Sequence, residues 1–237
     1  MKIDFFIPKK VLPFLQDRLN DFYLAGGTAL SMFYYEHRES FDLDFFTKKF
    51  SKERIFKIVT NLSNDSKWKV ELISEQDKDN LIRMGVYMVQ IDQETQCKID
   101  FVEDYMELLN PLKQIDGIKV LSLEDIYLRK IYAIAGHIPM INEIGQEIMF
   151  GGRQTAKDFY DIYCLSTITM PLSEFVSQHC SNATKEGVVH WYRTYDRTDM
   201  KVDLLGLLTK TKPDFQLMEN HFKKEINQLL KSLIEGK

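Results

Sequence analysis

The 237-residue sequence lacks a long hydrophobic run, and its apolar stretches are far shorter than a membrane span. The opening residues, "MKIDFFIPKK", have no extended apolar core and no small-residue cleavage site, so we expect no secretion signal. Only three cysteines occur, Cys97, Cys164 and Cys180, and their spacing fits no metal-ligand motif. We therefore expect a cytoplasmic protein without a membrane segment, with reduced cysteines that serve in packing.

An excess of positive charge is also missing. The chain has 31 Lys and Arg against 35 Asp and Glu, a net charge of −4 at pH 7. The whole chain thus carries no general signal for nucleic-acid binding, although charge can still segregate into a local basic patch on folding.

The first 120 residues combine short alternating apolar runs, typical of strands, with segments of helical spacing. Ser51 stands where a helix N-cap is expected, and the link "DQETQ" predicts a hairpin between two strands. Helices are predicted over 11–20, 28–37 and 51–65, and strands over 22–25, 40–47, 68–75, 84–91 and 97–104.

The pattern becomes helical from residue 121 onward, with Ser122 and Asp125 as a cap signal. The stretch 136–155, with four glycines and one proline, predicts a long connection or a broken helix. The fold class is therefore α+β: a small mixed sheet with flanking helices over 1–120, then a helical domain over 121–237.

Two acids stand in an apolar run, in "SFDLDFF". If this run is a strand, Asp42 and Asp44 point to the same face, because side chains alternate along a strand. Two like charges at the edge of an apolar layer repel each other, and a divalent cation would offset that repulsion. The alternative is a strand end or turn with two solvated acids, and the D-x-D alone does not decide between them.

A third acid, Asp100, stands in "CKIDFV", again flanked by apolar residues. One sheet could bring all three carboxylates to one face, and oxygen-only ligands suit Mg²⁺ or Mn²⁺. Carboxylates around such ions support in-line phosphoryl or nucleotidyl transfer.

A glycine turn precedes the D-x-D by about fifteen residues. Gly26 and Gly27 would let backbone N–H groups approach a phosphate, and the Thr28 hydroxyl could donate to the same group. Such turns are common, so the signal lies in its combination with the three acids.

These motifs resemble the nucleotidyltransferase AbiEii/AbiGii toxin family, a branch of the polymerase-beta-like nucleotidyltransferases that includes the MenT-type toxins. The family pattern is a GG-[ST]-A-L turn, a helix ending in His-Arg, and S-x-D-[IL]-D-F-F. The residues here that match this first motif are Gly26, Gly27, Thr28, Ala29, Leu30, His37, Arg38, Ser40, Asp42 and Asp44. Later, "LEDIYLRKIYAIA" maps the family's lysine onto Lys130, and "AKDFYDIYCL" matches its K-D-x-x-D motif at Lys157, Asp158 and Asp161. The segment between Lys130 and Lys157 is longer than the family's.

The resemblance implies a nucleotidyltransferase fold whose helical domain completes the active site. By resemblance, Asp42 and Asp44 bind metal, and Asp100 completes the metal site or acts as base. Lys130 would contact the nucleotide phosphates, and Asp158 would seat nucleotide or acceptor. The implied reaction moves a nucleoside monophosphate from an NTP to an acceptor, often a tRNA 3′ end, in a toxin paired with an antitoxin.

Other interpretations remain open from the residues. "DLDFFT" is similar to the D-x-D-x-T of haloacid-dehalogenase-type phosphatases, but Thr47 stands one residue too far along. A degenerate fold that only docks a partner is a third possibility. His37 and Arg38 could meet phosphate or acceptor, or cap a helix. Trp191 and Tyr192 could contact RNA, although packing is the simpler interpretation.

Overall fold

The computed structural model describes residues 6–78, 81–136, 138–141, 145 and 147–235. The chain divides into two compact units, which we call the N-terminal unit (residues 2–126) and the C-terminal unit (residues 127–237). The boundary falls within helix α4 (Leu123–Ala135). The functional division into a catalytic core over 1–120 and a completing domain over 121–237 stays a prediction.

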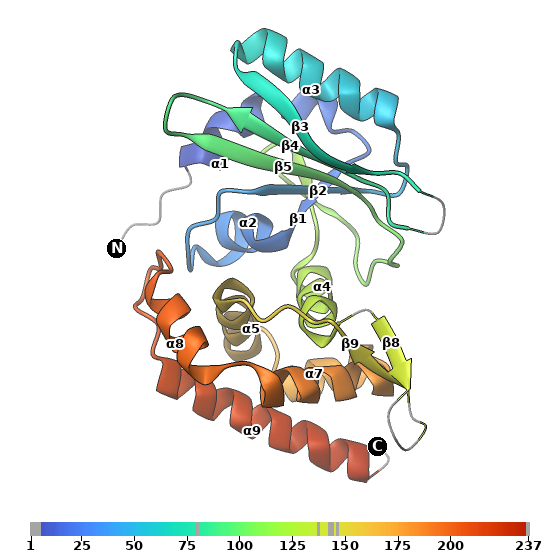
Figure 1. The fold of residues 1–237 in the computed structure, drawn as a ribbon, viewed down its shortest axis with the longest axis vertical. Coiled ribbons are helices and arrows are strands. Elements are labelled where there is room, and N and C mark those ends of the chain that lie inside the picture. Colours follow the sequence, from blue (N-terminus) through green and yellow to red (C-terminus); the bar gives the residue numbers. More distant parts are fainter. Residues whose placement is uncertain (1–5, 79–80, 137, 142–144, 146, 236–237) are drawn as a thin grey trace. The chain divides into compact units, whose positions relative to one another are not determined.

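A mixed sheet forms the centre of the N-terminal unit, and its described part has seven strands (Figure 1). Their order is β3-β4-β5-β2-β1-β7-β6. The central strand β2 pairs antiparallel with β1 and parallel with β5, while β4 pairs antiparallel with both β3 and β5. The predicted hairpin is therefore confirmed as β4–β5. The bounds are β1 (Tyr23–Ala25), β2 (Leu43–Thr47), β3 (Lys69–Gln76), β4 (Met84–Gln90), β5 (Gln96–Glu103), β6 (Lys113–Ile115) and β7 (Ile118–Val120).

Alternation along β2 and β5 separates a core face from a polar face. Phe45 and Phe101 are fully buried, and their rings stack with centroids 5.8 Å apart. Because neighbours along a strand point to opposite sides, Asp44 and Asp100 lie on the other face of the sheet. The aromatic residues thus anchor the two strands that carry the acids.

Helices α1 (Phe6–Val11) and α3 (Lys52–Ser66) pack on strands of this sheet. The predicted N-cap at Ser51 is confirmed, since its Oγ accepts the Arg54 N–H at 3.3 Å. The helix predicted over 11–20 is wrong. Two 3-10 turns follow α1 instead, Leu12–Phe14 and Gln16–Arg18, and Pro13 lies in the first of them. Proline has no N–H and clashes with the preceding helical turn, which breaks a continuous α-helix there.

The C-terminal unit is mainly helical (Figure 1). Its helices enclose an aromatic cluster in which Phe159, Trp191 and Phe222 are buried. Trp191 and Tyr192 are 2% and 9% exposed, which confirms packing as their role in the fold. The helices after α4 are α5 (Ala156–Ile168), α6 (Leu172–His179), α7 (Asn182–Thr194), α8 (Arg197–Leu205) and α9 (Phe215–Ile234).

A short hairpin occupies part of the stretch 136–155. Strands β8 (Ile138–Ile141) and β9 (Glu147–Phe150) pair antiparallel, and β9 contacts α7. The prediction of a long connection or a broken helix is wrong for these residues, because two short apolar runs pair with each other across the link. Residues 137, 142–144 and 146 lie outside the described ones.

The α+β class is confirmed by a mixed sheet followed by helices. The predicted cap of α4 is also confirmed, since the Ser122 Oγ accepts the Asp125 N–H at 3.0 Å. In the part of the chain that the structure describes, no helix has both the length and the apolar character needed to cross a membrane.

Candidate active site

Three adjacent strands bring the glycine turn and two of the predicted acids together. The register pairs Ala25 of β1 with Asp44 of β2, and Asp44 with Asp100 of β5. Neighbouring strands lie about 4.8 Å apart, and residues paired in register share a face of the sheet. Asp44 and Asp100 are therefore side by side, next to the residue where the glycine turn begins.

The turn packs against the Asp44 carboxylate. Gly26 has φ +69°, in the left-handed region, and a Cβ placed on it would lie only 2.1 Å from the Asp44 Oδ2. A Cβ on Gly27 would lie 2.3 Å from a terminal nitrogen of Arg38. Both glycines are required by close approach, and Gly26 also by its backbone conformation.

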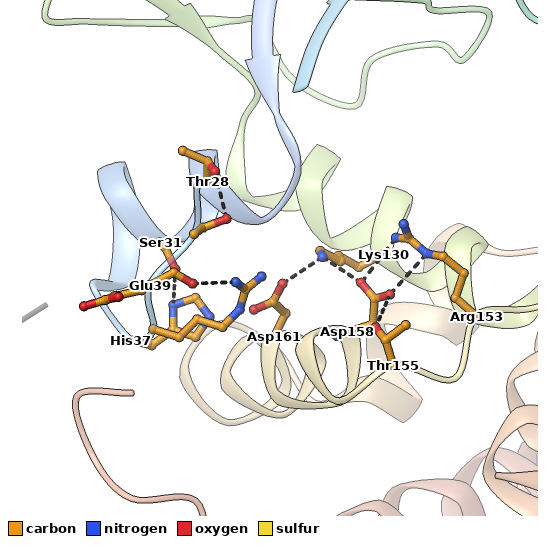
Figure 2. A network of polar contacts seen from close by, with 11 residues as sticks. Thr28, Ser31, His37, Glu39, Lys130, Arg153, Thr155, Asp158 and Asp161 are labelled. Atoms are coloured by element: carbon orange, nitrogen blue, oxygen red, sulfur yellow. Dashed lines mark hydrogen bonds and ion pairs between the residues drawn. The ribbon is translucent and has the colours of Figure 1, made fainter. Parts of the chain in front are cut away.

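The helix after the turn begins at Gly26, two residues earlier than predicted. It runs as α2 (Gly26–Leu30), continues as one π-helical stretch over Ser31–Tyr35, and ends at Glu36 in the left-handed conformation. The His37 Nδ1 lies 3.2 Å from the Ser31 Oγ, as Figure 2 shows. His37 is buried, and this contact ties it to the middle of the helical stretch 26–35.

Arg38 is the other half of the His-Arg pair and is almost fully buried, at 2% exposure. Its guanidinium lies against Gly27 and donates to the Glu39 carbonyl at 2.9 Å. A buried positive charge beside the turn favours an anion there, because the low dielectric weakens screening. The role of Arg38, whether contact with phosphate or acceptor or a helix cap, stays a prediction.

Thr28 links the turn to the segment that carries Asp42. Its hydroxyl hydrogen-bonds to the Ser40 hydroxyl at 2.8 Å and to the Asp42 carbonyl, and it is fully buried. The strand predicted over 40–47 is three residues too long, so Asp42 precedes β2. The β1–β2 ladder ends at the pair Ala25–Asp44, and beyond it the Asp42 carbonyl accepts from the Thr28 hydroxyl.

Lys98 lies on the same face of β5 as Asp100, and its Nζ donates to the Asp100 Oδ2 at 2.8 Å. Burial by itself lowers the pKa of Lys98. The hydrogen bond to Asp100 and the charges of Asp100, Asp42 and Asp44 together outweigh burial, so the pKa is raised. All three predicted acids therefore act on a single ammonium group.

The residues fit a hard divalent cation in their donor chemistry. The Asp100 Oδ1 is buried and has no hydrogen-bond partner, a costly state that a metal ion would relieve. Carboxylate oxygens are the ligands that Mg²⁺ and Mn²⁺ prefer. Within the described ranges, no group of three His, Cys, Asp or Glu side chains is placed so that it could hold a metal ion. The second oxygen of Asp100 is taken by Lys98.

The C-terminal unit contains a buried ion cluster made of the other predicted residues (Figure 2). The Lys130 Nζ lies 2.7 Å from the Asp158 Oδ1 and 2.7 Å from the Asp161 Oδ2. All three side chains are at most 8% exposed. A buried cluster of this kind is stable only while each charge keeps its partner.

Asp158 has two further partners at the start of α5. Arg153 approaches its Oδ2 at 3.1 Å, and the Thr155 hydroxyl, the N-cap of α5, donates to the same oxygen at 2.9 Å. Burial raises the pKa of Asp158, but the charges of Lys130 and Arg153 outweigh it and hold the pKa below its usual range. Asp158 is thus held as a carboxylate.

These contacts bear on the roles predicted for the cluster. Lys130 is held between two carboxylates in this structure. Its contact with nucleotide phosphates stays a prediction, as does the nucleotide or acceptor role of Asp158. Lys157 is exposed and lies outside the buried group.

Sequence reasoning missed Lys98, and it named Arg38 only as a candidate for contact with phosphate or acceptor or for a helix cap. Lys98 carried a signal, since it stands two residues before Asp100 and must share its face of the strand. Arg38 was noticed, but its burial under the glycine turn depends on contacts that no local pattern reveals.

Solved structures with a similar fold include a candidate nucleotidyltransferase from Helicobacter pylori. That match has a TM-score of 0.58 and 17% identity, and covers 97% of this chain and 96% of the other. MenT4, a nucleotidyltransferase toxin from Mycobacterium tuberculosis, matches with a TM-score of 0.53 and 14% identity over 94% of this chain and 82% of its own. At these identities the matches support the nucleotidyltransferase fold.

An uncharacterized protein of Aquifex aeolicus is 37% identical over 153 residues, which are 62% of this chain. The match spans 58% of that relative's length.

A family model described as "Nucleotidyl transferase AbiEii toxin, Type IV TA system" matches residues 15–235. The match covers nearly the whole chain and includes both units. It confirms the family resemblance and the predicted class of enzyme, and it favours a nucleotidyltransferase over a phosphatase. The chain belongs to the AbiEii family of nucleotidyltransferase toxins.

Proposed function

We propose that this protein transfers a nucleoside monophosphate from an NTP to the hydroxyl of an acceptor. The observation that carries the proposal is the register that puts Asp44 between Asp100 and the last residue before the glycine turn. A turn suited to phosphate and two carboxylates suited to metal thus lie on adjacent strands.

In the proposed site, Asp42, Asp44 and Asp100 hold Mg²⁺ or Mn²⁺. When bound, the cation would neutralise phosphate charge and lower the pKa of the attacking hydroxyl. Gly26 and Gly27 let backbone N–H groups approach the phosphates, with the buried Arg38 charge behind them. Thr28 contributes by fixing the Asp42 carbonyl rather than by pointing its hydroxyl at the nucleotide.

We extend the proposal to Lys130 and Asp158 as nucleotide-binding residues. Support comes from the family motif and from the buried ion cluster, since perturbed titratable groups gather at functional sites. A role in phosphate binding requires the Lys130 ammonium to exchange one carboxylate for a phosphate oxygen.

The acceptor in this proposal is the 3′ end of a tRNA, and the partner is a cognate antitoxin. Both rest on the family alone. The net charge of −4 gives no support of its own for RNA binding.

The test incubates the protein with each labelled NTP, Mg²⁺ and total tRNA. We expect label on the RNA, and Asp44→Asn should lower the rate at least about 100-fold, because lost charge stabilisation at the metal is worth several kcal/mol. The matched control is Glu94→Gln, in the exposed link between β4 and β5, which should leave the rate unchanged.

Other outcomes would point elsewhere. Label that persists on tRNA whose 3′ end has been oxidised by periodate would exclude the 3′ hydroxyl as acceptor. Phosphate release from monoesters without an NTP would favour a phosphatase. Nucleotide-stimulated partner binding that survives Asp44→Ala would favour a binding module.

A further inference from the structure

Lys98 is a charged residue of the site that the proposed function does not use. It lies among the metal-binding candidates, yet an ammonium cannot ligate a cation. Its Nζ is 2.8 Å from the Asp100 Oδ2, and its side chain is 34% exposed while that of Asp100 is 14% exposed. The contact is therefore covered at the carboxylate end and open at the lysine end.

We propose that Lys98 is an internal counter-ion that holds Asp100 before metal binds, and that the divalent cation displaces its ammonium. The inference rests on the proposed function for the existence of the metal site. It adds that the metal-free and metal-bound proteins differ in the partner of Asp100.

The need for a counter-ion follows from the register. Asp44 and Asp100 are directly paired on neighbouring parallel strands, and like charges side by side in a sheet are destabilising. Lys98 is the basic residue on the same face of β5, and its Nζ donates to the Asp100 Oδ2 at 2.8 Å. It thus offsets their repulsion where the sheet must fold without metal.

The need for displacement follows from the two oxygens of Asp100. Oδ2 accepts from Lys98, whereas Oδ1 is buried without a partner and is the oxygen left for a cation. A divalent ion there would lie within a few ångströms of the ammonium, and two positive charges at that distance repel strongly. The lysine has a flexible stem and an exposed side, so it can leave.

The chain offers a matched control in Lys69. It stands two residues before Glu71 on β3 and pairs with it, which is the same spacing as Lys98 and Asp100. Both Lys69 and Glu71 are exposed, at 70% and 53%. Any general effect of removing a lysine from a strand should appear in both variants.

The test titrates NTP-free protein with Mn²⁺ and follows free Mn²⁺ by electron paramagnetic resonance. Lys98→Met should bind Mn²⁺ about tenfold more tightly than wild type, the change produced by loss of one competing ion pair of about 1.4 kcal/mol. Lys98→Arg, which keeps the charge, and Lys69→Met should both resemble wild type. Equal or weaker binding by Lys98→Met would overturn the proposal.

A second measurement uses the wild-type protein, in which the Lys98 ammonium is intact. In the wild-type chain, saturating Mg²⁺ should shift the Nζ resonance of Lys98, identified by its absence in Lys98→Arg. An unchanged resonance would overturn the proposal even if Lys98→Met fails to fold. Asp44→Asn separates the two levels: if it binds Mn²⁺ as wild type does, the metal site itself is wrong. If it binds more weakly and Lys98→Met shows no gain, only the displacement is wrong.

Discussion

At Gly26 the backbone and a carboxylate together leave no room for a side chain. We predict that Gly26→Ala loses transferase activity and is less stable than Gly117→Ala. Both glycines have positive φ, +69° and +79°, so an alanine in this left-handed conformation destabilises the fold by about 1–2 kcal/mol at either position. Only at Gly26 does the new Cβ meet an atom at 2.1 Å, the Asp44 Oδ2, whereas at Gly117 the nearest atom is 3.8 Å away. Urea unfolding of the two variants and of wild type measures the difference, and equal losses would contradict the close approach.

Lys130 gives a second residue-level prediction. Lys130→Met should lower the free energy of unfolding by about 3–5 kcal/mol, because it leaves Asp158 and Asp161 buried without their shared cation. Lys157→Met is the control, since Lys157 is exposed, and should change stability by less than about 0.5 kcal/mol. Urea unfolding at pH 7 measures both. A small effect at Lys130 would show that the pair of carboxylates does not depend on it.

The sequence predicted single residues of the site best where one strand position carries the chemistry. Asp100 and Asp44 could be predicted to face one side because alternation fixes the direction of a side chain within a strand. Asp42 lies outside β2, and its position depends on the Thr28 hydroxyl, so alternation does not apply to it. Arg38 needed knowledge of a contact with Gly27, which depends on the tertiary fold.

Among the elements, local chemistry predicted caps and hairpins well. Ser51 and Ser122 cap their helices through hydroxyl contacts only three residues away, and β4–β5 closes through a short polar link. Long-range pairing was not predictable in the same way. The parallel pairing of β2 with β5 joins residues about 56 apart in the chain, and nothing local sets its register. The hairpin β8–β9 was missed because the four glycines and one proline of 136–155 indicated a connection or a broken helix.

The contact between α5 and α9 carries a pH-dependence prediction. The Ser166 hydroxyl lies 2.8 Å from the His221 Nε2, and it accepts the Leu172 N–H at 2.9 Å, so its own proton can be donated to the histidine. Burial lowers the pKa of His221 below its usual 6.5, against a smaller opposing effect of Glu225. A lowered pKa means that the unfolded chain takes up the proton first.

The contribution of neutral His221 to the free energy of unfolding should therefore be complete above pH 6.5. It should be lost as the pH drops from there through the folded-state pKa of His221. His221→Gln cannot titrate and should lose this dependence between pH 7.5 and 5. The measurement is the urea midpoint of both proteins across that range. If the two slopes are the same, another group is responsible for the change.

At the scale of the whole molecule, the two units carry one tryptophan each, Trp68 in the N-terminal unit and Trp191 in the C-terminal unit. Labelling with 5-fluorotryptophan gives each unit its own ¹⁹F signal without a substitution. Trp68 contacts the ring of Phe14, with centroids 5.0 Å apart, and Trp191 is buried in the aromatic cluster, so both signals should change on unfolding.

We predict that Mn²⁺ without NTP raises the urea midpoint reported by Trp68, and that EDTA reverses the change. A ligand that binds only the folded state at 100 times its Kd stabilises it by about 2.7 kcal/mol. Asp44→Asn should remove the gain, because it takes away a carboxylate that is in register with Asp100. The Trp191 signal in the same sample then tells whether the C-terminal unit shares the stabilisation. If Mn²⁺ leaves the Trp68 midpoint unchanged in the wild-type protein, its carboxylates do not form a metal site in the absence of nucleotide.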